Sequence, residues 1–108
     1  MKFIIYFHQQ WVGDHSPEWF QARGPMARAV VKEMKEAGVL VFAGGLDEDM
    51  QKAVGVNANG EISAPISLRG DYLGGLTIIE VASEIEAKKW GAKVAIACGW
   101  PQEIREIK

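Results

Sequence analysis

Disulfide bonds, long apolar runs and targeting signals are all missing from this sequence. Cys98 is the only cysteine, so no disulfide can form within the chain. Disulfide-stapled secreted domains are therefore excluded, and a reducing compartment, the cytoplasm, is expected. No run approaches the ~18 apolar residues of a membrane-crossing helix. The short apolar start at Met1 has no small-residue cleavage site. We therefore expect neither a signal peptide nor a membrane partner.

An excess of charge of one sign is missing as well. Twelve Lys and Arg oppose fourteen Asp and Glu, which leaves a net charge of −2. Nucleic-acid-binding domains usually carry a basic patch or stripe, so we expect no nucleic-acid partner. The glycine motifs of nucleotide sites, the G-x-S-x-G elbow and the C-x-x-C pair are also missing. We therefore expect no cofactor.

The chain has the size and composition of one soluble globular domain. Its 108 residues are 48% hydrophobic and 24% charged, which is close to the globular average. We therefore expect a single domain spanning residues 1–108.

The first half predicts a strand, a helix and a second strand. The apolar run from Phe3 to Phe7 is typical of a buried strand. Ser16 followed by Pro17 predicts a helix start, because serine caps the first turn and proline fits its first position. We expect a break or a kink at Gly24-Pro25, since proline removes a helical hydrogen bond. Gly38 ends the second piece. Apolar residues at helical spacing predict its buried side: Met26, Ala29, Val30, Met34 and Ala37.

The second half completes the pattern. A strand over residues 39–43 is followed by a hairpin around Asn57–Gly60, a strand over residues 73–81, a helix from Ser83 and a closing strand within residues 102–107. This order predicts an α+β, ferredoxin-like fold, in which an antiparallel sheet carries two helices on one face.

The other face of that sheet is expected to be apolar too. Alternation places Phe3, Ile5 and Phe7 on one side of the first strand, and Ile4, Tyr6 and His8 on the other. Because the helices cover one face only, a lone chain would expose a large apolar patch, which soluble monomers rarely do. We therefore expect a homodimer that packs through the open sheet faces.

Several segments resemble a YCII-related domain of the DGPF type, in the dimeric α+β barrel superfamily. They are the opening strand at residues 1–6, Ser16-Pro17-Glu18, the helix-to-strand passage at residues 36–46, the Leu-Gly-Gly strand at residues 73–81 and the closing strand. The resemblance covers nearly the whole chain. It implies the dimeric fold and a family mostly of unknown function, some of whose members are proposed as enzymes on small, often aromatic, molecules.

The chain departs from the pattern of that family at its characteristic motif. Asp-Gly-Pro-Phe falls on Ser63-Ala64-Pro65-Ile66, so Ser63 stands where the family has a carboxylate. The histidine that relatives carry early in the long helix falls near Ala27. The acidic position before Leu-Gly-Gly is kept as Asp71. The resemblance therefore implies the fold and the dimer, but does not carry over a His-Asp mechanism.

His8 is the leading candidate for chemistry. It ends the first strand on the predicted dimer side and could act as a general acid or base near neutral pH, oriented by Asp71 or Asp14. The alternative is a strand-end histidine bonded to backbone or water. His8, Asp14 and His15 could also form a metal set. The alternative there is a helix-entry loop, and we expect no metal.

Four residues are candidate ligand contacts. Arg69 could hold a carboxylate or phosphate through its guanidinium fork. Tyr6, Trp11 and Ser63 could line the same pocket. The alternatives are an exposed loop ion pair for Arg69 and core or interface packing for the rings.

These features predict a dimeric, small-molecule-binding enzyme of the acid/base lyase or isomerase type. Its pocket would lie at the open sheet face and take a small aromatic or anionic ligand. The alternative is a non-catalytic ligand-binding or structural dimer with a degenerate family site.

Overall fold

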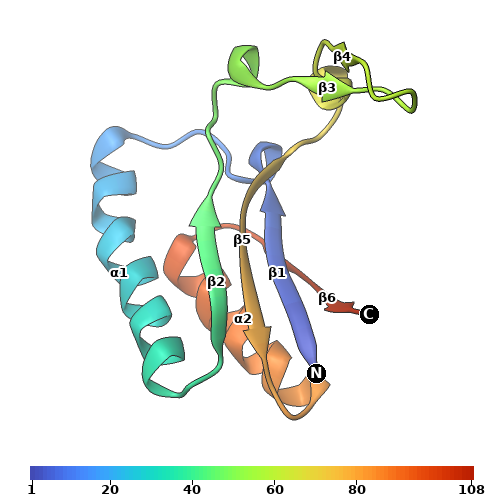
Figure 1. Cartoon of the computed structure of the whole chain (residues 1–108). Helices are drawn as coiled ribbons and strands as arrows, with labels where there is room; N and C mark the ends of the chain where they lie inside the picture. The colour runs from blue at the N-terminus through green and yellow to red at the C-terminus, as the bar shows by residue number, and fades with distance from the viewer.

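The computed structural model describes residues 1–67 and 70–108 in full. Its helices and strands follow the predicted order (Figure 1). They are β1 (Lys2–His8), α1 (Pro17–Glu36), β2 (Leu40–Gly45), β3 (Gly55–Val56), β4 (Ile62–Ser63), β5 (Leu73–Glu80), α2 (Glu84–Cys98) and β6 (Glu103–Ile107).

The four longer strands form one antiparallel sheet in the order β2-β5-β1-β6. Both helices lie on the same face of this sheet, and β3 pairs with β4 in a separate hairpin that projects past the ends of the strands (Figure 1). This arrangement confirms the predicted α+β, ferredoxin-like fold. The closing strand β6 lies at the sheet edge, as its alternating sequence predicts.

The register of the central strands decides which side chains face the helices. Phe3 pairs with Ile79 and Ile5 pairs with Thr77 across β1 and β5, so these side chains share one face. Ile5 and Ile79 are fully buried there, and Met34 of α1 is fully buried against the same core. The predicted alternation of β1 is therefore confirmed.

Helix α1 is continuous, and the expected break at Gly24-Pro25 is wrong. A residue before proline normally avoids the helical region because its Cβ meets the proline ring. Gly24 has no Cβ, so the chain can stay helical there. Pro25 donates no hydrogen bond to the carbonyl of Gln21, but both residues are exposed and water can bind that carbonyl.

The buried side of α1 is rotated from its predicted position. Val30 packs against the core, but Met26 is 45% exposed, and Ala29 and Ala37 are exposed as well. The helix instead turns Ala27 and Val31 toward a cavity beneath the sheet. The start of α1 is as predicted, since the Trp19 backbone N–H donates to Ser16 Oγ at 3.2 Å.

Helix α2 packs closely on the edge strand β6. The Glu86 N–H donates to Ser83 Oγ at 3.2 Å, and the Ala82 N–H donates to the Glu86 carboxylate at 3.2 Å, so the predicted cap is present. Gly91 is buried, and a Cβ at this position would overlap the side chain of Ile104. The missing side chain thus sets the distance between helix and sheet.

The hairpin of β3 and β4 exposes several large apolar side chains. They are Val54, Val56, Ile62 and Ile66.

Within the described residues, neither helix combines the length and the apolar composition that a bilayer span needs.

The close contact at Gly91 predicts a stability loss on a minimal substitution. Gly91→Ala should lower the free energy of unfolding by up to about 2 kcal/mol, because overpacking of the α2–β6 contact costs about 1–3 kcal/mol and alanine gains only about 1 kcal/mol over glycine in a helix interior. Chemical denaturation measures the change.

Ala92→Leu is the matched control, because this neighbouring residue is exposed. It should stay within about 0.5 kcal/mol of wild type. A Gly91→Ala variant about 1 kcal/mol more stable than wild type, the gain expected from helix propensity alone, would contradict the close packing of α2 against β6.

Candidate functional site

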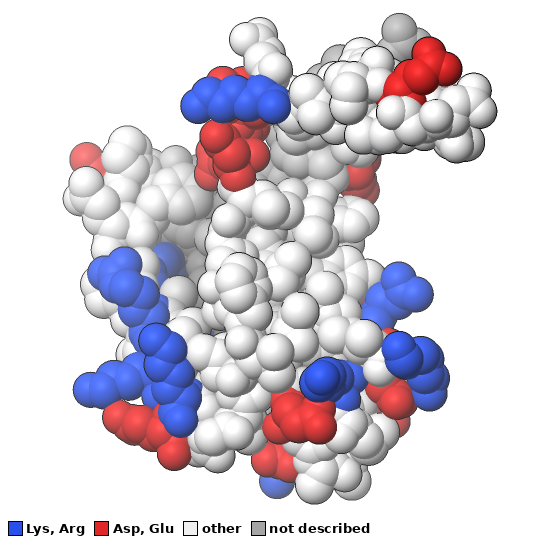
Figure 2. Space-filling model, viewed as in Figure 1, with Lys and Arg blue, Asp and Glu red and all other residues white. Residues whose placement is uncertain are grey.

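The sheet face away from the helices carries the residues that the sequence singles out. Tyr6 pairs with Leu76 and Ile4 pairs with Ile78, so β1 and β5 both send apolar side chains to this open face. Phe42 of β2 shares the face and is 56% exposed. Figure 2, viewed onto this side of the sheet, shows an uncharged surface along its middle with charged groups at the borders.

His8 and Asp71 lie close together at one end of the open face. His8 Nδ1 is 3.6 Å from Asp71 Oδ2, which is longer than a hydrogen bond but within ion-pair distance if the imidazole is protonated. Nδ1 itself is shielded from solvent and has no hydrogen-bond partner among the described residues. The side chains of His8 and Asp71 are 31% and 57% exposed. The structure therefore brings these two predicted residues together.

Backbone contacts hold this pair in place. The turn Gln9–Trp11 follows β1 directly, and the Gln9 N–H donates to the Tyr72 carbonyl at 2.8 Å. The Tyr72 N–H in turn donates to Gln10 Oε1 at 3.1 Å. Because Tyr72 follows Asp71 directly, these two bonds fix the carboxylate beside the end of β1.

Two aromatic rings flank His8. Trp11 stacks on the imidazole with ring centroids 4.7 Å apart and an interplanar angle of 22°. Tyr6 lies 6.0 Å from His8 and 6.4 Å from Trp11, again between ring centroids. The predicted residues Tyr6, His8 and Trp11 therefore form one aromatic cluster.

Tyr6 is fixed by the edge strand. Its hydroxyl donates to Glu103, which lies directly opposite on β6. This hydrogen bond, followed by burial, raises the pKa of Tyr6, because both favour the neutral phenol. Next to the cluster is a shallow cavity of about 320 Å³ on the open face. It is lined by Ile4, Tyr6, His8, Leu73, Arg105 and Glu106.

Two other predicted site residues lie elsewhere. Asp14 is exposed in the loop before α1. Ser63 lies in β4 of the projecting hairpin, where its hydroxyl donates to the Ala64 carbonyl at 2.9 Å. Arg69 lies outside the described residues. Of the two carboxylates predicted to orient His8, Asp71 is therefore the one that lies beside it.

The hypothetical metal set of His8, Asp14 and His15 does not assemble. His15 stacks on Trp19 with ring centroids 3.6 Å apart, and its Nε2 lies 3.0 Å from the Val12 carbonyl oxygen. Among the described side chains, no group of three or more His, Cys, Asp or Glu residues is placed to hold a metal ion.

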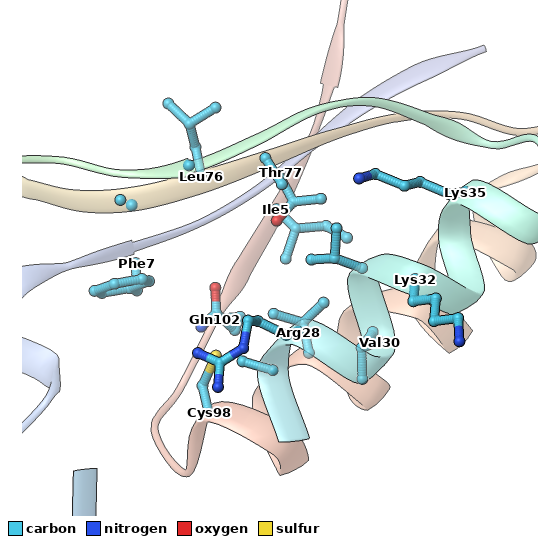
Figure 3. A pocket seen from close by; sticks show the side chains of 17 residues that line it. Ile5, Phe7, Arg28, Val30, Lys32, Lys35, Leu76, Thr77, Cys98 and Gln102 are labelled. Atoms are coloured by element: carbon cyan, nitrogen blue, oxygen red, sulfur yellow. The ribbon is translucent and has the colours of Figure 1, made fainter. Parts of the chain in front are cut away.

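A larger cavity lies on the opposite face of the sheet, between the strands and both helices. This helix–sheet cavity has a volume of about 520 Å³ (Figure 3). Its walls are mainly apolar and include Ile5, Phe7, Val30, Val31, Thr77 and Val94. The resemblance assigns a histidine to α1 near position 27. In this chain the residue there is Ala27, which lines this cavity.

Sequence reasoning missed this cavity, although a signal for it exists. Gly45 pairs with Gly75 across β2 and β5, and both line the cavity. A Cβ at Gly45 would meet only the Gly74 carbonyl oxygen, at 4.0 Å, so the missing side chain of Gly45 leaves room, whereas the Phe7 ring fills the space at Gly75. Cys98 lies on the opposite wall, and burial raises the pKa of its thiol. A thiol with a raised pKa fits a packing role for Cys98 and not that of a nucleophile.

The Tyr6–Glu103 bond predicts a measurable titration. In a Tyr72→Phe background, which leaves Tyr6 as the remaining tyrosine, Glu103→Leu should lower the pKa of Tyr6 toward its ordinary value. Ultraviolet absorbance of the phenolate measures this. A raised folded-state pKa stabilises the fold below the ordinary tyrosine pKa, and this contribution disappears as pH rises through the folded value. The stability difference between the two proteins should therefore shrink at high pH.

Glu106→Gln is the control, because Glu106 lies on the same strand but pairs with Phe3. It should leave the Tyr6 titration unchanged. If Glu103→Leu leaves the Tyr6 pKa where it was, the hydrogen bond does not hold the phenol.

Comparison with known proteins gives a likeness of fold. No model of a known protein family matches the chain. No curated protein matches it either. The chain is similar to the solved structure of 5-chloro-2-hydroxyhydroquinone dehydrochlorinase (TftG) from Burkholderia phenoliruptrix AC1100 in complex with 2,5-dihydroxybenzoquinone, at a TM-score of 0.52 and 16% identity. The match covers 100% of this chain and 94% of that one. At this identity the likeness shows the fold alone, and the resemblance to YCII-related domains stands as a likeness of fold.

Proposed function

We propose that this protein is a small-molecule-binding enzyme of the acid/base lyase or isomerase type, with His8 as its acid/base group. The observation that carries the proposal is the orientation of His8. Its Nδ1 faces Asp71 and is shielded from solvent, although the side chain as a whole is partly exposed. A histidine held through one nitrogen by a carboxylate offers its other nitrogen to a ligand.

The proposed chemistry follows from that orientation. Nε2 takes a proton from a hydroxyl or a C–H group of the bound molecule, and the imidazolium returns it to the product. Asp71 stabilises the imidazolium and fixes the ring. The separation of 3.6 Å closes to hydrogen-bond length when a ligand excludes water, as catalytic contacts commonly tighten on binding.

The surroundings of His8 favour a small aromatic or anionic ligand. Tyr6 offers a phenol that stays neutral, and Trp11 stacks on His8 beside the cavity. Arg105 lines the cavity with a positive charge, and the neighbouring Glu106 carboxylate is paired with Lys108. The TftG structure holds 2,5-dihydroxybenzoquinone, a molecule of this class. Arg69, Asp14 and Ser63 remain proposed ligand contacts, although Ser63 lies on the projecting hairpin and Asp14 in the loop before α1.

A second copy of the chain is proposed to cover the open face. Val41 and Phe42 are exposed there beside the partly buried Leu76 and Ile78. An apolar sheet face of this kind is stabilised when two copies pack face to face, and the shallow cavity near His8 then becomes enclosed.

The alternative function is a non-catalytic, ligand-binding dimer. It is favoured by the exposure of Asp71, which weakens the pull of the carboxylate on His8 through solvent screening. The Ala27 methyl group, at the position that the resemblance assigns to a histidine, favours it as well.

The proposed site predicts binding and proton exchange with one probe. Wild-type protein should bind 2,5-dihydroxybenzoquinone and speed the exchange of its ring hydrogens with D₂O. His8→Gln should reduce the exchange rate by about 100-fold or more, since general acid/base catalysis contributes about 10²–10⁴-fold. Calorimetry measures binding and proton NMR measures exchange.

His15→Gln is the matched control, because His15 stacks on Trp19 away from Asp71. It should behave as wild type. Binding that depends on His8 without any acceleration of exchange would favour the alternative function. Binding and exchange that are both insensitive to His8→Gln would refute the site.

The dimer predicts that one charge on the open face separates the copies. Phe42→Glu should convert a dimer to a monomer at micromolar concentration, because a buried, unpaired carboxylate at the interface is costly. Light scattering coupled to size-exclusion chromatography measures the mass.

Ile85→Glu serves as the control, since Ile85 is exposed on α2 on the helix side of the sheet. This variant should remain a dimer. A wild-type protein that is monomeric at micromolar concentration would contradict the proposed assembly.

A further inference from the structure

The helix–sheet cavity has positive charge on one side and no visible use in the proposed chemistry. Arg28, Lys32 and Lys35 of α1 all line it, and no carboxylate is among its described lining residues. Figure 3 shows the Lys35 chain extending from α1 toward the sheet, whereas the Lys32 chain is turned away. Lys32 lies 4.0 Å from Glu36, so its charge has a partner on the helix. Arg28 and Lys35 form no ion pair within the described residues.

An unpaired donor lies in the same cavity. Gln102 Nε2 is buried and has no hydrogen-bond partner among the described residues. Figure 3 shows the Gln102 amide directed into the cavity between Phe7 and Arg28. A buried polar group without a partner is costly, so an acceptor atom from outside the chain would stabilise it.

The rest of the wall is apolar. Ile5, Val30 and Val94 come from the sheet and from both helices, so an apolar body would be in contact on several sides. The volume of about 520 Å³ lies in the range of about 300–1,000 Å³ that is typical of small-ligand sites.

We propose that the helix–sheet cavity is a second binding site, which takes a small carboxylate with an aromatic or aliphatic body. The apolar body lies against Ile5, Val30 and Val94. The carboxylate accepts a hydrogen bond from Gln102 and pairs with Arg28 and Lys35. Charge-assisted hydrogen bonds of this kind are about twice as strong as neutral ones, so the anion contributes most of the selectivity.

Calorimetry with 2-naphthoate tests this site. Wild-type protein should bind 2-naphthoate and should bind the neutral 2-naphthamide at least about tenfold more weakly, a ratio that corresponds to one lost charge-assisted contact. The double variant Arg28→Gln, Lys35→Gln should lose about tenfold or more in affinity for 2-naphthoate. Gln102→Leu should weaken binding as well. Circular dichroism checks that the double variant and Gln102→Leu are folded.

Lys32→Gln is the matched control, because it removes the charge that is turned away from the cavity and paired with Glu36. Its affinity should stay within about twofold of wild type. Amide NMR signals of Thr77 and Val94 should shift on saturation. The proposal is overturned if 2-naphthoate does not bind, if 2-naphthamide binds equally well, or if the double variant binds like Lys32→Gln.

This inference is independent of the proposed function. His8 and Asp71 lie on the open face, whereas Arg28, Lys35 and Gln102 lie on the helix face. His8→Gln should therefore leave 2-naphthoate affinity unchanged. If 2-naphthoate binding is lost with His8→Gln and retained in the Arg28, Lys35 double variant, the ligand lies at the open face and the second site is refuted.

Discussion

The pairing of β1 with β5 is the constraint on which the rest of the structure depends. Its register buries Ile5 and Ile79 completely against Met34, so the strands cannot slip by one residue without moving the core side chains into solvent. The same register places Tyr6 and His8 on the opposite face. One set of backbone hydrogen bonds therefore fixes both the core and the candidate site.

The two faces of the sheet have different chemistry as a consequence. The helix face is apolar, and the missing side chain of Gly45 leaves room beneath the sheet, with cations of α1 along one side. The open face combines exposed apolar side chains with a histidine, a carboxylate and stacked rings. A fold that is covered on one side only thus has an apolar cavity beneath the sheet and an apolar surface on its open face.

Sequence pattern predicts the features that depend on neighbouring residues. The alternation of β1, the caps at Ser16 and Ser83 and the order of elements are examples, because each follows from local periodicity or local hydrogen bonding. Helix α1 continues through Pro25 because Gly24 has no Cβ to meet the proline ring. The general expectation that proline interrupts a helix does not take the preceding residue into account. The contact between His8 and Asp71 depends on bonds of the Gln9–Trp11 turn to Tyr72, and the helix–sheet cavity depends on side-chain volumes from several elements. Neither the contact nor the cavity can be predicted from any single segment of the sequence.

The central claim is that Asp71 orients the His8 imidazole for acid/base chemistry, and nitrogen-15 NMR of that ring tests it most directly. If Asp71 accepts a hydrogen bond from Nδ1 once a ligand is bound, the neutral ring of wild-type protein saturated with 2,5-dihydroxybenzoquinone should carry its proton on Nδ1, and Asp71→Asn should shift the population of the complex toward the Nε2 tautomer. The same tautomer ratio in wild-type protein and in Asp71→Asn would contradict the account.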